Sequence, residues 1–210
     1  MPKKRKSQQR DLKLRLHIFC EGEKTEPNYL KGYIEFYFPG TTLILIHKTK
    51  KNTPVELVGE AVDEKNRKDI PEEDQFWVVY DRESSIKYPN AKHEEAYAKA
   101  KANGIKTAFS NVCFEVWLLL HFQATVPAFD SCDDLCKRSP LKKHIPNYDK
   151  GEKRNYTETE ISNARKNAVK LNKQTIAGAN SSWKKPYQWN PYTDVYKLLN
   201  AMDKHQKEHG

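Results

Sequence analysis

The sequence has no apolar run of about 18 residues, the length that a membrane-spanning helix needs. Its basic N-terminus is not followed by an apolar signal core, so we expect a cytoplasmic protein with no membrane partner. Only four of the 210 residues are cysteine, which is too few for a disulfide scaffold and fits a reducing compartment. A glycine-rich nucleotide-binding loop is also absent, since residues 21–24 (EGEK) do not have the pattern of a phosphate-cradling loop.

The chain nevertheless has enough apolar residues to form a core. Hydrophobic residues make up 37% of it and aromatic residues 11%, a composition that excludes wholesale disorder. A length of 210 residues suits one compact domain, or one domain with an elaborated end.

The net charge of +9 is divided unevenly along the chain. Residues 1–15 carry a net +6, residues 16–136 a net −6, residues 137–185 a net +9, and residues 186–210 a net charge of zero. The basic segments could bind a polyanion, and the acidic middle could hold a cation. The alternative is that all of these segments are ordinary solvated surface.

Strand and helix patterns alternate through the first 124 residues. Short apolar runs predict strands at residues 14–20, 42–47, 76–80 and 105–109. Helical spacing and capping residues, Thr25 and Thr53 among them, predict helices at residues 25–37, 53–68, 91–103 and 114–122. The alternation predicts an α/β fold with a mostly parallel, Rossmann-like sheet flanked by helices. Ligands bind such sheets beyond the carboxyl ends of the strands.

The pattern changes at about residue 124. Strand signals end there, and lysine- and asparagine-rich stretches with helical spacing follow at about residues 130–138, 158–173 and 191–207. We therefore expect a basic flexible tail at 1–15, an α/β domain at 16–124, and a basic, mainly helical extension at 125–210 that packs on the domain.

Acidic and amide side chains follow three of the predicted strands. They are Glu21, Glu23 and Glu26 after the first strand, Asp81 and Glu83 after the third, and Asn111 and Glu115 after the fourth. Carboxylates from adjacent strand ends converge and raise one another's pKa unless a cation neutralises them. Such oxygen ligands suit Mg²⁺ or Mn²⁺. A purely structural role is the competing possibility, since acids at strand ends also favour helix N-termini or face solvent.

A zinc site is the weaker metal hypothesis. Cys132, Cys136 and His144 have side chains that bind zinc, but the sequence offers no convincing fourth ligand.

Four blocks of sequence resemble the RloB family. They are EGEKTEPNY at residues 21–29, DRE at 81–83, SNVCFEVWLLLHF at 110–122 and NPYTDV at 190–195. The third block is long and unusual, which makes it the most specific. The resemblance runs from about Leu16 to Leu199.

The RloB family is regarded as Toprim-like, similar to the nuclease domains of topoisomerases, bacterial primases and OLD-type nucleases. The resemblance implies that Glu21 is a general acid/base or metal ligand, and that Asp81 and Glu83 bind Mg²⁺ or Mn²⁺. Glu26 and Glu115 are second-tier candidates for the same catalytic site.

Substrate contacts are expected from basic and amide residues near the same strand ends. The candidates are Lys24, Lys48, Arg82 and Asn111. For each lysine, plain surface exposure is the alternative. The aromatic and basic stretch at 181–192 is typical of single-strand binding surfaces, although loop packing accounts for it equally well.

Members of the RloB family are associated with bacterial restriction and phage-defence loci, often beside an ABC-type ATPase. The resemblance therefore implies a metal-dependent nuclease that cleaves RNA, such as transfer RNA, or DNA in antiphage abortive infection, with an ABC-type ATPase as partner. Glu83 departs from the family, which commonly has Asp there. This departure favours an alternative, a non-catalytic nucleic-acid-binding or regulatory subunit of an ATPase-containing defence complex. The oligomeric state is left open, a homo-oligomer included.

Overall fold

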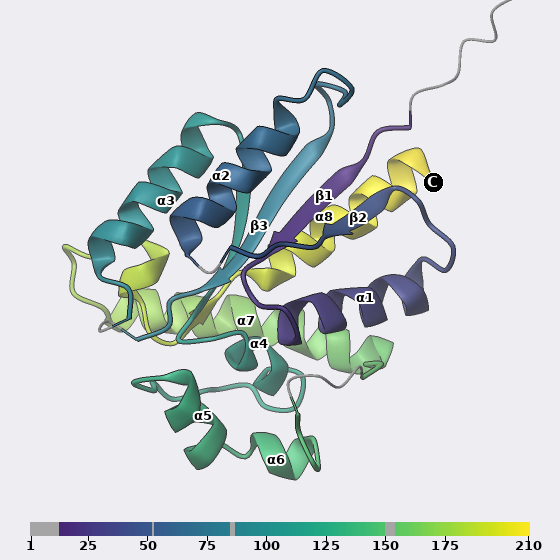
Figure 1. The fold of residues 1–210 in the computed structure, drawn as a ribbon. Helices are drawn as coiled ribbons and strands as arrows, with labels where there is room; N and C mark the ends of the chain where they lie inside the picture. The colour runs from purple at the N-terminus through teal and green to yellow at the C-terminus, as the bar shows by residue number, and fades with distance from the viewer. Residues whose placement is uncertain (1–12, 52, 85–86, 150–153) are drawn as a thin grey trace, which may run out of the picture.

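A computed structural model of the chain describes residues 13–51, 53–84, 87–149 and 154–210. These residues form an α/β fold around a five-stranded sheet with the strand order β2-β1-β3-β4-β5 (Figure 1). Most of the predicted basic tail at 1–15, namely residues 1–12, lies outside the described residues.

Parallel strands make up most of the sheet. They are β1 (Leu16–Cys20), β2 (Ile44–His47), β3 (Gln75–Asp81) and β4 (Lys106–Asn111). The short strand β5 (Tyr192–Thr193) runs antiparallel beside β4 and pairs Thr193 with Ser110. The mostly parallel, Rossmann-like sheet flanked by helices that the sequence predicts is therefore confirmed. The carboxyl ends of the four parallel strands meet at one edge, which is where a site is expected.

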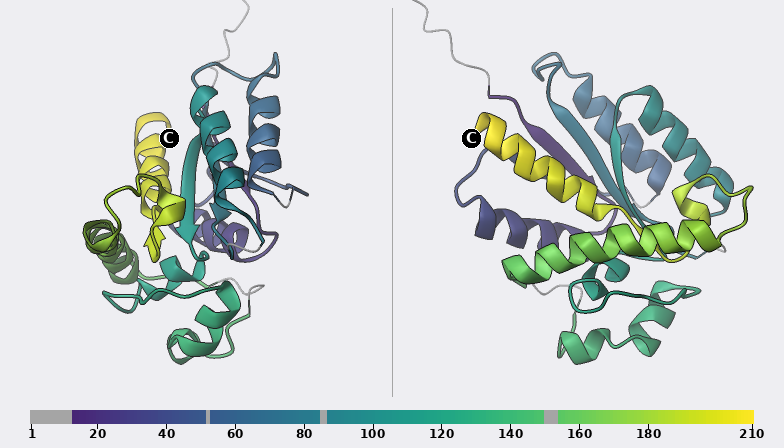
Figure 2. Two further views of the ribbon diagram at one scale, coloured as in Figure 1. Left: turned by 90° about the vertical axis from the view of Figure 1, so that its left-hand side faces the viewer. Right: turned by 180° about the vertical axis from the view of Figure 1, so that it is seen from behind.

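Helices cover both faces of the sheet (Figure 2). On one face lie α2 (Pro54–Lys65) and α3 (Asn90–Ala102), and on the other lie α1 (Thr25–Tyr37) and α8 (Val195–His209). Because successive strand residues point to opposite faces, Phe19 joins the core under α2 and α3, whereas Ile18 joins the core under α1 and α8.

A group of shorter elements lies beyond the carboxyl ends of the strands (Figure 1). It consists of α4 (Glu115–Leu119), α5 (Cys132–Arg138) and α6 (Leu141–His144). The long helix α7 (Glu158–Gly178) packs beside β5 and α8, and η1 (Pro186–Gln188) precedes β5. No helix in the described ranges is both long enough and apolar enough to cross a bilayer.

Local sequence signals account for where several helices begin and end. The hydroxyl of Thr53 accepts a hydrogen bond from the Glu56 N–H, as a capping box predicts. Gly104 has a φ of 66°, the left-handed conformation that glycine adopts after a helix. Thr25, in contrast, does not cap α1 as predicted, because the helix already includes Thr25 and Lys24 precedes it.

The prediction that no strand follows residue 124 is wrong, because β5 completes the sheet. Two residues are too few to show an alternating pattern. Tertiary hydrogen bonds hold β5 instead: Thr193 and Asn172 exchange two bonds, and the Asp194 carboxylate accepts from the Phe109 N–H.

Candidate active site

An acidic pocket lies at the carboxyl edge of β1 and β3. Its volume is about 360 Å³, and its lining includes the carboxylates of Glu21, Glu23, Glu26, Asp81, Glu83 and Glu115. The segments that contribute them are the β1–α1 connection, the end of β3 and the first turn of α4. Parallel strands bring these segments together because their carboxyl ends share one edge of the sheet.

Asp81 ends β3 at the inner side of this pocket. Its Oδ2 accepts a hydrogen bond of 3.1 Å from the Phe114 N–H, whereas its buried Oδ1 has no hydrogen-bond partner among the residues that the structure describes. Burial raises the pKa of Asp81 well above its usual value, and the nearby Glu26, Glu115 and Glu21 raise it further. The site therefore disfavours a charged Asp81 unless a cation compensates it.

Glu21 lies beside Asp81. Its Oε2 accepts a hydrogen bond of 3.3 Å from the Asp81 N–H. Burial raises the pKa of Glu21 to about 7, with the Asp81 N–H opposing the rise and Glu83 and Glu26 adding to it. A carboxyl group with a pKa near 7 exchanges protons readily at neutral pH, as a general acid/base must.

Glu83 occupies the outer part of the pocket. Its side chain is 32% exposed and forms an ion pair of 2.9 Å with Lys87. Its backbone has a φ of 56°, an uncommon conformation for a residue with a side chain, and the Glu83 N–H donates to the Val112 carbonyl.

Glu26 and Glu115 are both buried against the pocket. The Glu115 carboxylate accepts a hydrogen bond of 2.7 Å from the Tyr148 hydroxyl and one of 3.2 Å from the Cys132 thiol. Neither Tyr148, which contacts Glu115, nor Lys87, which pairs with Glu83, was predicted from the sequence. Tyr148 lies 33 residues beyond Glu115 in a segment without a motif, so no sequence signal points to it.

The predicted substrate contacts divide between the pocket and other places. Lys24 is exposed and lines the acidic pocket. Lys48 is exposed just after β2 and does not line it. Asn111 is buried and donates a hydrogen bond to the Tyr187 carbonyl, at the edge of a neighbouring pocket that also includes Glu83.

Arg82 is not positioned to contact a substrate in the acidic pocket, because its side chain turns away and is buried. The guanidinium donates hydrogen bonds to the carbonyls of Tyr88 and Tyr187, at 2.6 and 3.2 Å, and to the Asn90 side chain at 3.0 Å. The period of two in a strand accounts for this, since residues next to each other point to opposite sides. Arg82 therefore connects the loop before α3 to the segment around η1.

We expect Arg82→Lys to lower the free energy of unfolding by about 2–4 kcal/mol. Lysine is a point charge on a flexible stem, so it leaves several buried carbonyl oxygens without donors. Urea denaturation measures the change, and Lys92→Gln on the exposed surface of α3 is the control. A loss below about 0.5 kcal/mol, typical of surface substitutions, would contradict this role.

A second group of possible metal ligands adjoins the pocket. Ligand atoms of Cys113, Glu115 and Cys132 lie within 4.8 Å of one another. His144, which the zinc hypothesis included, instead stacks on Phe122 with ring centroids 4.8 Å apart. The structure therefore does not bring His144 to these cysteines.

The acidic pocket fits a hard divalent cation. The unpartnered, buried Oδ1 of Asp81 is an oxygen that a cation would satisfy, and the neighbouring carboxylates supply the negative charge. The proposed metal ligands Glu21, Asp81 and Glu83 line the same pocket, but their carboxylate oxygens do not all lie within 4.8 Å of one another. Water would then complete the coordination shell, as is usual for Mg²⁺.

The fold and this site define an α/β protein with a carboxylate-lined pocket at the carboxyl edge of a mostly parallel sheet. The chain belongs to the RloB-like protein family, whose model matches residues 16–202. The family resemblance in the sequence is thereby confirmed over most of the chain. No curated protein and no solved structure matches the chain.

Proposed function

We propose that the protein is a Toprim-like, Mg²⁺- or Mn²⁺-dependent nuclease that cleaves phosphodiester bonds in RNA or DNA. The observation that carries the proposal is the buried, unpartnered oxygen of Asp81 beside a Glu21 carboxyl group whose pKa is about 7. One residue has the properties of a metal ligand and the other those of a proton carrier.

The roles of the side chains follow from their positions. Asp81, with Glu83 at the outer side of the pocket, would hold the cation, which supplies Lewis-acid stabilisation of phosphoryl charge when bound. Glu21 holds or releases a proton beside it. The Phe114 N–H fixes the Asp81 carboxylate, and Tyr148 fixes that of Glu115. Lys24, at the rim, would attract a phosphate group.

A neighbouring pocket supports a single-stranded substrate. It has a volume of about 300 Å³, shares Glu83 with the acidic pocket, and is also lined by Trp183, Tyr187 and Asn111. Trp183 is 43% exposed, so a base could stack on its ring. Trp183 belongs to the segment at 137–185, which carries a net charge of +9 and so favours a polyanion.

A cleavage assay tests the proposal. Labelled single- and double-stranded RNA, transfer RNA and DNA are incubated with the protein and Mg²⁺ or Mn²⁺. We expect cleavage that Asp81→Ala and Glu21→Ala abolish. The control is Glu73→Ala, an exposed carboxylate just before β3, at the opposite end of that strand. Cleavage that persists in both pocket variants would refute the assignment of the site.

One observation favours a second candidate function. Lys87 already pairs with Glu83, the residue that departs from the family pattern, so a lysine partly satisfies a proposed metal ligand. In this alternative the protein is a non-catalytic nucleic-acid-binding or regulatory subunit. Metal titration separates the two: a pocket that binds neither Mg²⁺ nor Mn²⁺ supports the subunit.

We also propose that the nuclease acts in bacterial antiphage defence by abortive infection, with an ABC-type ATPase as partner. Membership of the RloB-like family supports this setting. Co-expression with an ATPase encoded beside the gene, followed by size-exclusion chromatography, tests the partnership, and separate elution of the two proteins would contradict it.

A further inference from the structure

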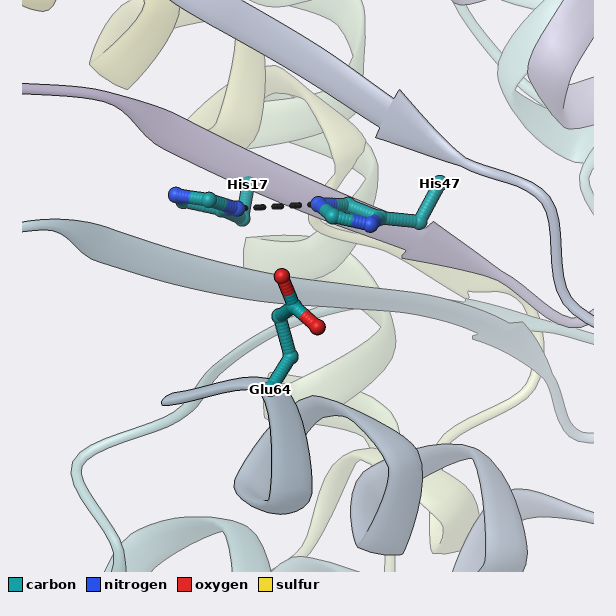
Figure 3. A group of neighbouring side chains, drawn as sticks. All are labelled: His17, His47 and Glu64. Atoms are coloured by element: carbon teal, nitrogen blue, oxygen red, sulfur yellow. Dashed lines mark hydrogen bonds between the residues drawn. The ribbon is translucent and has the colours of Figure 1, made fainter. Parts of the chain in front are cut away.

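Two histidines and a glutamate meet on the face of the sheet that α2 covers (Figure 3). His17 is on β1, His47 ends β2, and Glu64 is near the end of α2. The His17 Nδ1 and the His47 Nε2 lie 2.9 Å apart, and a ligand atom of each of the three residues lies within 4.8 Å of the other two. The nuclease proposal uses none of these side chains.

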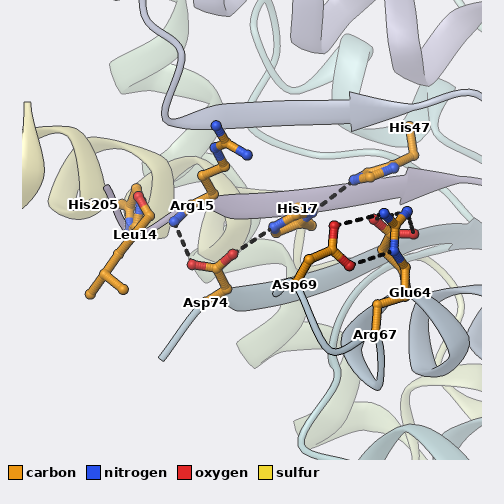
Figure 4. Close-up of polar contacts among 9 residues, drawn as sticks. All are labelled: Leu14, Arg15, His17, His47, Glu64, Arg67, Asp69, Asp74 and His205. Atoms are coloured by element: carbon orange, nitrogen blue, oxygen red, sulfur yellow. Dashed lines mark hydrogen bonds and ion pairs between the residues drawn. The ribbon is translucent and has the colours of Figure 1, made fainter. Parts of the chain in front are cut away.

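Asp74 fixes the tautomer of His17 (Figure 4). Its Oδ2 lies 2.9 Å from the His17 Nε2, and its Oδ1 accepts a hydrogen bond of 2.8 Å from the Arg15 N–H. Because the carboxylate accepts, Nε2 carries the hydrogen, and Nδ1 presents a lone pair toward His47. A histidine that binds a metal through one ring nitrogen typically donates its other N–H to a carboxylate in this way.

Glu64 is able to leave its present partner. Its side chain is 21% exposed and pairs with Arg67, which is 53% exposed and also binds Asp69 at 2.8 Å. Exposed ion pairs contribute at most about 1 kcal/mol, so giving up this one costs little. Arg67 keeps Asp69 as a partner when the Glu64 carboxylate turns toward the two imidazoles.

We propose that the His17 Nδ1, the His47 Nε2 and the Glu64 carboxylate form a zinc site. Two imidazoles and one carboxylate are a donor set that zinc takes when water fills the fourth position. Two nitrogen ligands of a tetrahedral zinc lie about 3.3 Å apart, so the nitrogens need to separate by about 0.4 Å. The rings also turn so that both lone pairs face the ion, and His47 carries its hydrogen on Nδ1 instead of Nε2.

This zinc site is separate from the acidic pocket. His17 precedes Glu21 by four residues on one extended segment, which corresponds to roughly 13 Å. Its ligands come from β1, β2 and α2, three elements far apart in sequence. Zinc bound there joins strands β1 and β2 to helix α2, and it stabilises the folded chain because the unfolded chain has no preformed site.

Zinc competition tests the proposal on the full chain. The protein is stripped with a chelator and titrated with Zn²⁺ against a chromogenic chelator, with excess Mg²⁺ present to occupy the acidic pocket. We expect one tightly bound zinc, lost in His47→Gln and Glu64→Gln. Asp74→Asn, which removes the carboxylate behind His17, weakens binding by about 10–100-fold.

Matched variants distinguish this zinc site from the acidic pocket and from the cysteine group. Arg67→Gln removes the same ion pair as Glu64→Gln but leaves the Glu64 carboxylate in place and unpaired. We therefore expect Arg67→Gln to bind zinc as tightly as the unsubstituted protein or more tightly. Cys132→Ser and Asp81→Asn, in the other two groups of ligands, leave this zinc bound. Co²⁺ in the site gives a visible spectrum without the sulfur-to-cobalt bands of a thiolate site.

Two results overturn the proposal. One is that no zinc binds to the stripped protein, which leaves His17 and His47 as a hydrogen-bonded pair. The other is that zinc depends on Cys132 or Asp81 and not on His47 or Glu64. Circular dichroism of the variants verifies the fold. If His47→Gln does not fold, zinc binding by Glu64→Gln tests the proposal, because Glu64 lies at the helix surface.

Discussion

Asp81→Asn is expected to abolish metal-dependent cleavage and to make the metal-free protein more stable. The amide cannot neutralise a cation, and the loss of several kcal/mol of transition-state stabilisation corresponds to at least about 10²–10³-fold in rate. The same change removes a carboxyl group that burial, Glu26, Glu115 and Glu21 all hold in an unfavourable environment for its charge. We therefore expect the free energy of unfolding to rise.

Thermal unfolding in a metal-free buffer measures the second effect, and the expected result is a rise in Tm, by about 2–4 °C for each 1 kcal/mol in a chain of this size. The matched control is Asp74→Asn, a second buried aspartate whose oxygens both have hydrogen-bond partners. The control loses an acceptor from a satisfied pair, so its Tm falls. A lower Tm for Asp81→Asn would show that the Asp81 carboxyl group does not destabilise the metal-free protein. Cleavage close to that of the unsubstituted protein would show that Asp81 is not a metal ligand.

Metal-free protein is expected to lose stability as the pH rises from about 4.5 to about 7. In that range Glu21 is already ionised in the unfolded chain but keeps its proton in the folded one, because burial raises its pKa to about 7. The folded state then binds more protons than the unfolded state, so the free energy of unfolding falls with pH, by roughly 3 kcal/mol from Glu21.

Urea denaturation in a chelating buffer, at several pH values, measures this effect. Glu21→Gln should remove this part of the decline, whereas the exposed Glu73→Gln should follow the unsubstituted protein. The other charged groups facing Glu21 are Asp81, Glu83, Glu26 and Lys87, with the Tyr88 hydroxyl beside them. They remain in both variants, so the difference between the two pH profiles isolates Glu21.

The same protons link pH to metal binding. A cation displaces the proton of Glu21, so this group alone is expected to raise Mg²⁺ affinity about tenfold per pH unit up to pH 7. A steeper rise, or one that continues above pH 7, is the contribution of Asp81, whose pKa is also raised. Calorimetric titration at pH 6 and pH 8 measures the ratio. An affinity independent of pH in the unsubstituted protein would mean that Glu21 does not take part in the site.

The sequence is sufficient to predict which acids meet. Glu21 and Asp81 each follow a run of apolar residues, and the alternation of strands and helices makes those runs parallel. Parallel strands end at a common edge, so the acids after them share one pocket wherever the rest of the chain goes.

The sequence does not predict the direction in which a single side chain points. Arg82 adjoins Asp81 in the sequence, yet its guanidinium is enclosed by carbonyl groups of the segments at Tyr88 and Tyr187. A basic residue next to a carboxylate gives no sign of whether it faces phosphate or backbone. That choice depends on Tyr187 in η1, 105 residues further along the chain.

The sequence by itself determined the α/β class, the parallel strands and the acidic edge, because each follows from local periodicity and from the geometry that all parallel sheets share. Only the tertiary structure decided the partners of Glu115, the burial of Arg82, the strand β5 and the meeting of His17, His47 and Glu64. The residues in these contacts do not belong to a common sequence motif, and they meet only when segments far apart in the sequence pack together.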